Sequence, residues 1–534
     1  MKLLIVASGL ATRVYSYTYQ KIPKYLISLD HYFGLYYMIQ YWKQYVDEIY
    51  IVIHPFYKKI TEYYIQHFLS DVSIQLLYYE HADGTALTIQ NILSQTFMEN
   101  EIEIDKRMVI TWCDIFPSNE VSIPFDDFCE NRVFTYGTNC RYGYEEETHK
   151  IVNYGNTGGD VIGIYYLHDY TKIKEMEMKY GTDFVDYFEL LGHFNTFYLS
   201  KVNDYGDENK IVEYKHHLYE QKQNQIEHRH FNKIEIIDDS ILYKYAITEQ
   251  GCQIIQKEIK WYEHLYEKNM ESIHSMILQP LQIEENGIYL PYIKKSKKLY
   301  EMIENEEIEI HEKQRILQKV IMNMNQLHNM DKKQITKEEW FRDIQYEIED
   351  KIMERYYDIL PILEDYQSII EVNGIEILSF DEILQKAKEI IYEYYENENR
   401  NEYEIIHGDL NFSNILYEEE TDKIIFIDPR GYFGKTNIYG YKEYDESKIL
   451  YGLSGYDKFN RDIYFKPNYV DNTKINFTIQ SYEYLFPFVR TKLHYAFLTI
   501  IWLGLAQYNK NNYWKCVCSY YHGLYIGTKY LFLT

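Results

Sequence analysis

The strongest constraint on the fold is the alternation of two kinds of segment over the first 205 residues. Short apolar runs typical of buried strands are separated by stretches with the periodicity of amphipathic helices. Such alternation builds a mostly parallel sheet covered by helices. The sequence therefore predicts an N-terminal α/β domain, a mixed, mostly parallel sheet with helices on both faces. We expect strands at 2–7, 48–53, 74–79 and 107–112, and helices at 32–45, 58–69 and 85–94.

The chain has 534 residues, which is too many for one such domain. A polar stretch from 207 to 230, rich in Lys, Glu, Gln and His, has the composition of a linker or a solvated helix. A metal site on its histidines is the alternative reading. We predict a first domain at 1–210, a linker at 211–230 and a second domain at 231–534.

The second domain begins with a small β-rich lobe and continues as a larger helical lobe. The division between the lobes is expected near residue 295. Paired strands are expected at 234–237 and 240–245, a helix at 254–266 and a strand at 287–293. Long charged helices are expected from 299 to about 395, a strand-rich patch at 404–427, and helices to the end.

Charge and cysteine usage limit the class of protein. Acidic residues number 82 and basic residues 55, a net charge of −27, which disfavours a nucleic-acid partner. The six cysteines include no CxxC pair, which favours free thiols in a reducing compartment and a cytoplasmic location. The apolar run 493–506 is short for a membrane span and predicts a core helix. The N-terminal apolar run is interpreted as a buried strand rather than a signal peptide.

A loop of small residues follows the first predicted strand. Small residues let backbone N–H groups approach a phosphate closely. Arg13 comes directly after the loop and Lys24 follows within a Pro-Lys dipeptide, so two cations can reach the same anion. These features predict a nucleotide-binding loop made of Ser8, Gly9, Leu10, Ala11 and Thr12.

This region resembles the nucleotidyltransferases that join an NTP to a sugar phosphate or a similar small phosphate. Their GxGTR-like loop and Pro-Lys dipeptide correspond here to GLATR, in which Ala11 replaces the second glycine, and to Pro23-Lys24. The resemblance implies a GT-A/Rossmann-like fold, with Asp114 and Asp204 binding Mg²⁺. It implies that the acceptor phosphate attacks the α-phosphorus of the NTP while Arg13 and Lys24 neutralise the developing charge. It also implies that the base is contacted by a turn made of Gly84, Thr85 and Ala86.

A second set of polar residues lies near the C-terminus. In the segment IIHGDLNFSNIL, Asp409 lies five residues before Asn414, and Asp428 follows the next apolar strand in IIFIDPRG. Phosphoryl transfer from ATP requires this arrangement: Asp409 would accept or orient the proton of the substrate hydroxyl, and Asn414 and Asp428 would hold Mg²⁺ against the ATP phosphates.

These motifs resemble the aminoglycoside phosphotransferase and choline kinase superfamily over residues 231–534. The resemblance implies a two-lobed α+β, protein-kinase-like fold. Lys244 would contact the ATP phosphates and pair with Glu258, and Tyr292 would lie in the hinge that contacts adenine through its backbone. Asp445 corresponds to an acid on the helix lining the acceptor site, with a helix-start acid as the alternative. Arg430 would either bind an anionic substrate or cap the loop.

Together the two halves predict a bifunctional enzyme. The kinase would phosphorylate a hydroxyl compound X, and the other half would couple X-phosphate to an NTP, with CTP favoured, for surface-glycan or lipid decoration. X is a sugar, a polyol or a choline-like alcohol. Tyr accounts for 61 residues, so aromatic clusters cannot argue for choline. An aminoglycoside-modifying enzyme and a scaffold of two degenerate folds are the alternatives. Expected partners are nucleotides and small molecules, with Mg²⁺ at both sites, and an oligomer is left open.

Overall fold

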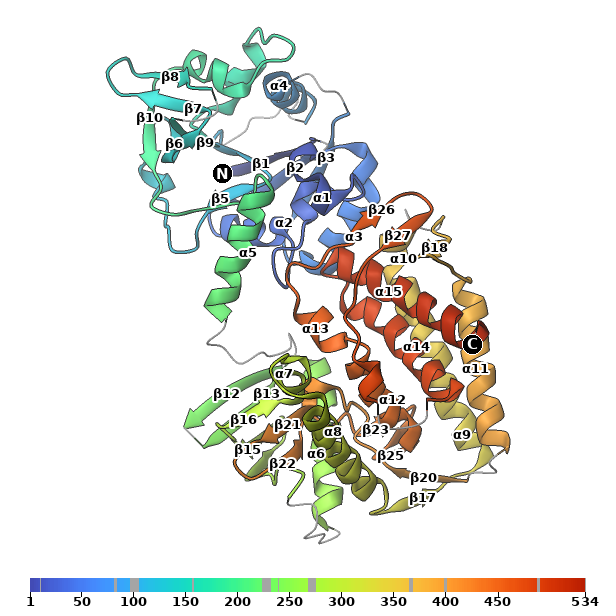
Figure 1. Cartoon of the computed structure of the whole chain (residues 1–534). Coiled ribbons are helices and arrows are strands. Elements are labelled where there is room, and N and C mark those ends of the chain that lie inside the picture. Colours follow the sequence, from blue (N-terminus) through green and yellow to red (C-terminus); the bar gives the residue numbers. More distant parts are fainter. Residues whose placement is uncertain are drawn as a thin grey trace. The chain divides into compact units, whose positions relative to one another are not determined.

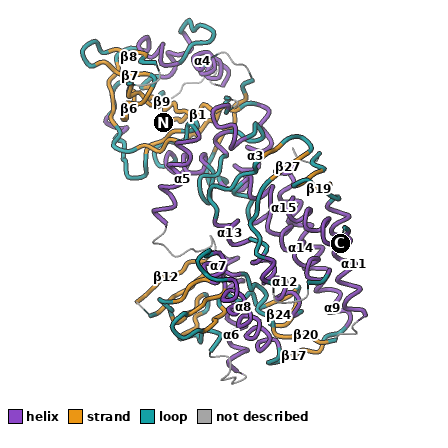
Figure 2. Tube along the Cα trace, viewed as in Figure 1, coloured by secondary structure: helices purple, strands orange, loops and turns teal. Residues whose placement is uncertain are grey.

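The fold is described from a computed structural model of the chain (Figures 1 and 2). It has two compact units, which we treat separately. The first comprises Met1–Glu220 and Asn511–Tyr513, and the second Gln221–Lys510 and Trp514–Thr534. The described residues are 1–9, 11–80, 84–96, 105–155, 158–222, 232–238, 240–267, 275–364, 368–397, 401–486 and 490–533.

The first unit is built on a nine-stranded sheet with parallel strands at its centre (Figure 1). β1 (Lys2–Ala7) pairs in parallel with β2 (Glu48–Ile53) and with β4 (Met108–Trp112), and β3 (Ile74–Tyr78) continues beside β2. β1 is buried along its whole length, as expected for a central strand with a layer on each face. The four strands expected here are confirmed, each within a residue of its predicted ends.

On the side of β4, the sheet continues through antiparallel pairings of β4 with β9 and of β9 with β6, whereas β10 pairs in parallel with β6, so the sheet is mixed. The strand order is β10-β6-β9-β4-β1-β2-β3, and β7 pairs with β8 and β9. The added strands are β6 (Asn131–Cys140), β7 (Tyr142–Glu145), β8 (Lys150–Asn153), β9 (Gly159–Leu167) and β10 (Phe194–Tyr198). The helices are α1 (Tyr15–Thr18), α2 (Gly34–Trp42), α3 (Lys58–Phe68), α4 (Thr85–Thr96) and α5 (Glu208–Lys222). This confirms the predicted mixed α/β architecture with a mostly parallel centre.

A short ladder outside the main sheet joins two distant parts of the first unit. β5 (Ile115–Pro117) pairs antiparallel with β11 (Val202–Asp204), and Ile115 lies opposite Asp204. The Tyr205 N–H donates to the Asp114 carbonyl at 3.0 Å, and the Tyr205 hydroxyl donates to the Cys113 carbonyl at 2.5 Å. This register brings Asp204 next to Asp114.

The second unit begins with a four-stranded antiparallel sheet. β12 (Asn232–Asp238), β13 (Ile241–Ala246), β15 (Gly287–Pro291) and β14 (Gln282–Glu284) lie in that order. α6 (Glu249–Glu267) follows β13, and its buried face, which recurs every three or four residues, packs on Ile288 and Leu290 of the sheet. The two paired strands, the helix and the following strand expected here are all present.

The rest of the second unit is largely helical (Figure 2). The apolar α14 (Lys492–Tyr508) packs against α10, α11 and α12, which confirms the predicted core helix. The other helices are α7 (Leu299–Glu304), α8 (Ile310–His328), α9 (Lys337–Ile344), α10 (Lys351–Leu363), α11 (Phe380–Asn397), α12 (Lys442–Leu453), α13 (Tyr456–Arg461) and α15 (Tyr513–Gly527). Short π-helical turns occupy Gln345–Asp350 and Thr528–Phe532.

Short strands cross this helical part. β16 (Ser296–Lys298), β21 (Ile415–Glu418) and β22 (Lys423–Phe426) form one sheet. The others are β17 (Lys332–Gln334), β18 (Glu371–Val372), β19 (Ile375–Glu376), β20 (Glu402–Ile405), β23 (Tyr432–Phe433), β24 (Thr436–Asn437), β25 (Tyr439–Gly440), β26 (Tyr469–Val470) and β27 (Lys474–Asn476).

The expectation of helices throughout 299–395 is wrong at 371–376. There Asn373 (φ 50°) and Gly374 (φ 80°) turn the chain between β18 and β19. An Asn-Gly pair with left-handed backbone at both residues makes the tight hairpin turn that matches strand twist. Strands β23 to β27 likewise interrupt the helices expected after residue 427.

Among the described residues, no helix combines the length and the apolar character needed to cross a lipid bilayer.

Candidate active sites

In the first unit, Lys24 and Asp114 meet where the parallel strands end. Lys24 begins a short 3-10 helix after Pro23, and its ammonium donates to the Asp114 carboxylate and, at 2.5 Å, to the Gly206 carbonyl. Both side chains are largely buried. The pairing unites two residues that the sequence assigned separately to charge neutralisation and metal binding.

Asp204 completes this group. Its carboxylate accepts from Lys210 Nζ at 2.6 Å and from the Gly206 N–H at 2.7 Å. Burial raises the pKa of Asp204, and the neighbouring Asp114 raises it further. A Cβ atom at Gly206 would lie 2.9 Å from Asp204 Oδ1 and 3.3 Å from Asp114 Oδ2, so the two carboxylates flank this glycine. Two mutually repelling carboxylates form an oxygen donor set that suits Mg²⁺.

The small-residue loop follows β1, which pairs in parallel with β4, the strand that precedes Asp114. Ala11 has left-handed backbone (φ 56°), and the short helix Thr12–Val14 places Arg13 at the surface. A Cβ atom at Gly9 would meet no atom within 4 Å, so the backbone there is open to a ligand. Ser8 is half-buried at the end of β1. Leu10, also predicted for this loop, lies outside the described residues.

The turn at the start of α4 is tied to a distant segment. Gly84 has φ 89°, and a Cβ atom there would lie 2.6 Å from the Thr182 carbonyl, so this position requires glycine. The Thr85 hydroxyl accepts from the Phe184 N–H at 2.8 Å, and the buried Ala86 donates its N–H to Thr182 at 3.3 Å. The proposed base contact of these three residues stays a prediction.

In the second unit, Lys244 of β13 joins two carboxylates. Its ammonium lies 2.7 Å from Glu258 of α6 and 2.8 Å from Asp428 beyond β22. Burial alone would lower the pKa of Lys244, but Asp428 and Glu258 outweigh it and the pKa is raised. Lys244 is therefore a fixed positive charge that joins the buried Glu258 to Asp428, whose side chain is 40% exposed. Asp428 itself has left-handed backbone (φ 57°).

Asp409 and Asn414 are bonded to each other within one loop. The Asn414 amide nitrogen donates to the Asp409 carbonyl at 2.9 Å and to Asp409 Oδ2 at 3.1 Å. This use of the nitrogen leaves the Asn414 amide oxygen as the metal-binding atom. The Ile427 N–H donates to the Asn414 carbonyl at 3.0 Å, which ties this loop to the segment carrying Asp428.

Asp445 lies in the first turn of α12, which agrees with the helix-start alternative, and a role at the acceptor site stays a prediction. This residue on α12 is fully buried, and its carboxylate accepts from the backbone N–H groups of His407 (2.9 Å) and Gly408 (2.7 Å). His328 Nε2 lies 3.1 Å from the same carboxylate. Asp445 therefore holds the loop that carries Asp409.

His407 is a neutral support of the same loop. The Asp409 N–H donates to His407 Nδ1 at 3.3 Å, so the proton lies on Nε2, which donates to the Ile427 carbonyl at 2.9 Å. Burial lowers the pKa of His407, although Asp445 and Asp409 oppose this.

Sequence reasoning missed several charged residues around Asp409. The first is Lys448, whose Nζ lies 3.0 Å from Asp409 Oδ1. The second is Glu347, which accepts at both oxygens from the predicted Arg430, at 2.8 and 2.6 Å. Lys351 also donates to Glu347, at 2.7 Å. Lys448 could have been found from its position one turn beyond Asp445 on α12. Glu347 and Lys351 carry no local sequence signal, because long-range packing alone brings them to this site.

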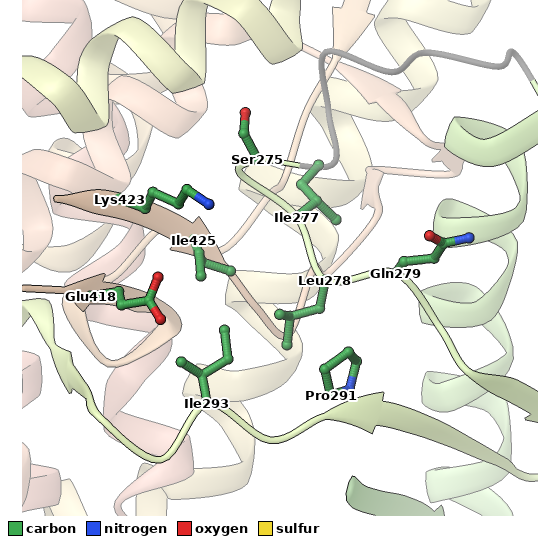
Figure 3. A pocket seen from close by; sticks show the side chains of 9 residues that line it. All are labelled: Ser275, Ile277, Leu278, Gln279, Pro291, Ile293, Glu418, Lys423 and Ile425. Carbon is green, nitrogen blue, oxygen red and sulfur yellow. The ribbon is translucent and has the colours of Figure 1, made fainter. Parts of the chain in front are cut away.

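A cavity of about 280 Å³ lies next to the predicted hinge (Figure 3). The side chains of Leu278, Ile293 and Ile425 point toward one another, with Glu418 and Lys423 at one side. Tyr292 does not line the cavity, although its neighbours Pro291 and Ile293 do. Its N–H donates to the Ser240 carbonyl at 2.7 Å.

No cluster of three or more His, Cys, Asp or Glu side chains within the described ranges is placed to hold a metal ion. Each candidate site offers two oxygen ligands, from Asp114 and Asp204 or from Asn414 and Asp428. That number fits Mg²⁺, which commonly keeps water and phosphate oxygens in its coordination shell.

No protein-family model matches the chain, and no curated protein matches it. Three solved structures that resemble it match about the N-terminal 40% of the chain. HddC from Yersinia pseudotuberculosis, alone and complexed with GMP-PN, is 19% identical with a TM-score of 0.33, over 41% of this chain and 99% of its own. A proposed glucose-1-phosphate thymidylyltransferase from Bacillus anthracis, in complex with a sucrose, is 16% identical with a TM-score of 0.33, over 43% of this chain and 97% of its own. We base the function on the arrangement of this chain's own side chains.

Proposed function

We propose that the chain is a bifunctional enzyme that phosphorylates a small hydroxyl compound with ATP and then couples the resulting phosphate to an NTP, releasing pyrophosphate. The observation that carries this proposal is the meeting of Lys244, Glu258 and Asp428 next to the linked pair Asp409 and Asn414. These residues are far apart in the sequence. Phosphoryl transfer needs them together, because catalysis there rests on positioning and charge neutralisation.

In the kinase half each group has a defined task. The fixed ammonium of Lys244 binds ATP phosphates, and Glu258 orients it. Asp428 and Asn414 offer oxygen ligands to Mg²⁺, which supplies charge neutralisation of the phosphates when bound. Asp409 orients the acceptor hydroxyl and accepts its proton. The buried Asp445 keeps this loop in place through two backbone hydrogen bonds.

In the nucleotidyltransferase half, Lys24, Asp114 and Asp204 surround Gly206. The two carboxylates offer ligands to Mg²⁺, and Lys24 and Arg13 bind phosphate oxygens. The open backbone at Gly9 gives the nucleotide phosphates a place to lie close to the loop. CTP is the favoured nucleotide, and we propose a cytoplasmic enzyme that supplies NDP-linked groups for surface-glycan or lipid decoration.

Mass spectrometry tests the two steps in one mixture. Purified protein is incubated with ATP, CTP, Mg²⁺ and a panel of hydroxyl compounds, and X-phosphate and NDP-X are quantified. We expect Asp114→Asn to accumulate X-phosphate without NDP-X. We expect Asp409→Asn to form neither product unless X-phosphate is added, because the second site remains intact.

Exposed residues provide matched controls. Asp126→Asn in the first unit and Glu420→Gln in the second alter side chains that are 99% and 66% exposed, so both should behave as wild type. If the protein inactivates an aminoglycoside and forms no NDP-X, a drug-modifying enzyme is favoured. No consumption of either nucleotide would favour a non-catalytic scaffold.

A further inference from the structure

Basic side chains gather around Asp409, although the chain as a whole carries a net charge of −27. Lys448 lies 3.0 Å from the Asp409 carboxylate. Arg430 lies behind the same loop: its N–H donates to the His407 carbonyl, and a Cβ atom at Gly408 would lie 3.2 Å from Arg430 Cβ. We call Lys257, Lys351, Arg430 and Lys448 the basic cluster.

Two tyrosines connect the members of the basic cluster. The Tyr444 hydroxyl accepts from Arg430 at 2.9 Å, and Lys448 Nζ lies 5.7 Å from the centre of the Tyr444 ring. The Tyr432 ring has Arg430 and Lys257 each 4.0 Å from its centre. The cluster is therefore continuous from the carboxylate of Asp409 to the N-terminal end of α10.

The cations in this region outnumber the carboxylates that neutralise them. Glu347 is buried and accepts from both Arg430 and Lys351, while Asp409 is paired with Lys448. Burial lowers the pKa of Lys351, Arg430 lowers it further, and Glu347 only partly opposes them, so we do not count Lys351 as a cation. Among the described residues of the cluster, the cations counted are Lys257, Arg430 and Lys448, against the carboxylates Glu347 and Asp409. Lys351 and Arg430 keep 16% and 13% of their side chains exposed, so a small anion can reach them.

We propose that the acceptor of the kinase half is an anionic hydroxyl compound, bearing a carboxylate or phosphate group that binds the basic cluster. This inference rests on the proposed kinase function and narrows its substrate class. A choline-like or aminoglycoside acceptor would place further positive charge beside Lys448 and Arg430. Like charges in a poorly solvated site repel strongly, so such acceptors are excluded.

The reaction is the same for every acceptor. The acceptor hydroxyl oxygen forms a bond to the γ-phosphorus of ATP, and the bond from that phosphorus to the β–γ bridging oxygen breaks. The hydroxyl proton passes to Asp409, and ADP leaves. Lys257, Lys351 and Arg430 take no part in these bond changes; they hold the anionic end of the acceptor so that the hydroxyl meets Asp409, and Lys448 lies beside the Asp409 carboxylate.

Matched acceptor pairs test the inference with the wild-type full-length protein. Glycerate and glycerol 3-phosphate are compared with glycerol, and gluconate with glucose, with choline and kanamycin as cations; phosphorylated product is measured by mass spectrometry. We expect kcat/KM for an anionic member to exceed that of its neutral partner at least about tenfold, the effect of one charge-assisted contact. Comparison of glycerate with glycerol 3-phosphate shows whether the basic cluster prefers a carboxylate or a phosphate group.

Failure of the inference differs from failure of the proposed function. Phosphorylation of only neutral or cationic acceptors overturns the inference and leaves the kinase standing. A panel without any phosphorylated product rejects the kinase and the inference with it.

A variant locates the effect at the cluster. Lys351→Met removes an N–H donor and should raise KM for the anionic acceptor about tenfold with kcat little changed, and Lys351→Arg should restore KM because an N–H donor returns. Lys435→Met, at an exposed lysine between β23 and β24, is the matched control. An unchanged KM in a folded Lys351→Met protein overturns the assignment of Lys351. If that variant does not fold, the wild-type acceptor pairs decide the inference alone.

Discussion

At the scale of single residues, Asp409 is held from three directions. Asn414 bonds its carboxylate, Lys448 pairs with it, and the Asp409 N–H donates to His407. These partners fix the orientation of the carboxylate, and in the proposed kinase reaction it would face the acceptor hydroxyl while the adjacent ammonium would reach the transferred phosphoryl group.

Replacing Lys448 by Met removes this positive charge beside the reacting groups. We expect kcat of the kinase reaction to fall about 100-fold, in the range seen when one charge-stabilising group is lost, with KM for ATP unchanged. Steady-state kinase assays measure both constants. Lys458→Met, at an exposed lysine on α13, is the control. Wild-type kcat in Lys448→Met would contradict the role of Lys448.

Asp457 gives a pH dependence that can be isolated. It is buried at the start of α13 and accepts from the Ser413 N–H at 3.0 Å; burial raises its pKa to about 7, although Arg461 opposes this. The folded state therefore binds a proton that the unfolded state, with an ordinary pKa near 3.8, releases. The contribution of this proton to the free energy of unfolding is complete below the pKa of Asp457 in the unfolded chain, and it is lost as the pH rises through 7.

In the Asp457→Asn variant the side chain at this position cannot ionise, so the variant should not lose this contribution to stability. We expect the free energy of unfolding of the variant, minus that of the wild type, to rise between pH 4 and pH 7 and to be constant above pH 8. Urea unfolding curves at several pH values provide it. A difference independent of pH would show that Asp457 ionises normally in the folded protein.

At the scale of elements, the register of β5 and β11 sets the distance between the two carboxylates of the first unit. Gly206 lies two residues after the end of β11, and it contributes no side chain between Asp114 and Asp204. The ladder is only three residues long on each side, so the site depends on one local pairing.

Gly206→Ala should separate the carboxylates. The new Cβ atom would lie 2.9 Å from Asp204 Oδ1 and 3.3 Å from Asp114 Oδ2, so the Asp204 carboxylate must shift and the Asp114 carboxylate must move slightly, whereas 3.8 Å to Lys24 Nζ is ordinary contact. We expect NDP-X formation to fall about 100-fold, as for a misplaced reacting group. The kinase activity of the same preparation is the internal control. If Gly206→Ala forms NDP-X at the wild-type rate, the group around Asp114 and Asp204 is not the site of nucleotidyl transfer.

Sequence reasoning succeeded for elements whose signals are local. The strands of the first sheet are continuous apolar runs, and helix α14 is apolar on all sides, so both were predicted with nearly their observed bounds. The hairpin at Asn373-Gly374 was missed although its turn signal is present, because charged helical periodicity on both sides dominated the interpretation. The position of Asp445 near the start of a helix was foreseen as an alternative, but its complete burial was not, because burial of an acid has no sequence signature.

At the scale of the whole molecule, each unit has its own apolar core. The first contains residues of β1, β2, β4 and β9 with those of α4, and the second contains two clusters around α6 and α8. Contiguous cores of this size are typical of domains that fold independently.

We therefore expect the fragments 1–222 and 223–534 to fold when produced separately. Each should unfold in a single cooperative transition, because its core is internal. Circular dichroism during thermal unfolding measures this, and a mixture of the fragments should convert X to NDP-X. A fragment without a cooperative transition would contradict the independence of the units.

Two residues with side chains adopt left-handed backbone in segments that we propose to bind nucleotides: Ala11, four residues after β1, and Asp428, two residues after β22. For L-amino acids this conformation costs about 1–2 kcal/mol, and glycine avoids it. If selection acted only on the amount of folded protein, it would favour glycine at both positions. That change would be harmless at residue 11, where glycine keeps the loop small, but at residue 428 it would remove the carboxylate. In a lineage that keeps the protein but no longer needs the proposed kinase activity, we expect Asp428 to be among the first residues replaced.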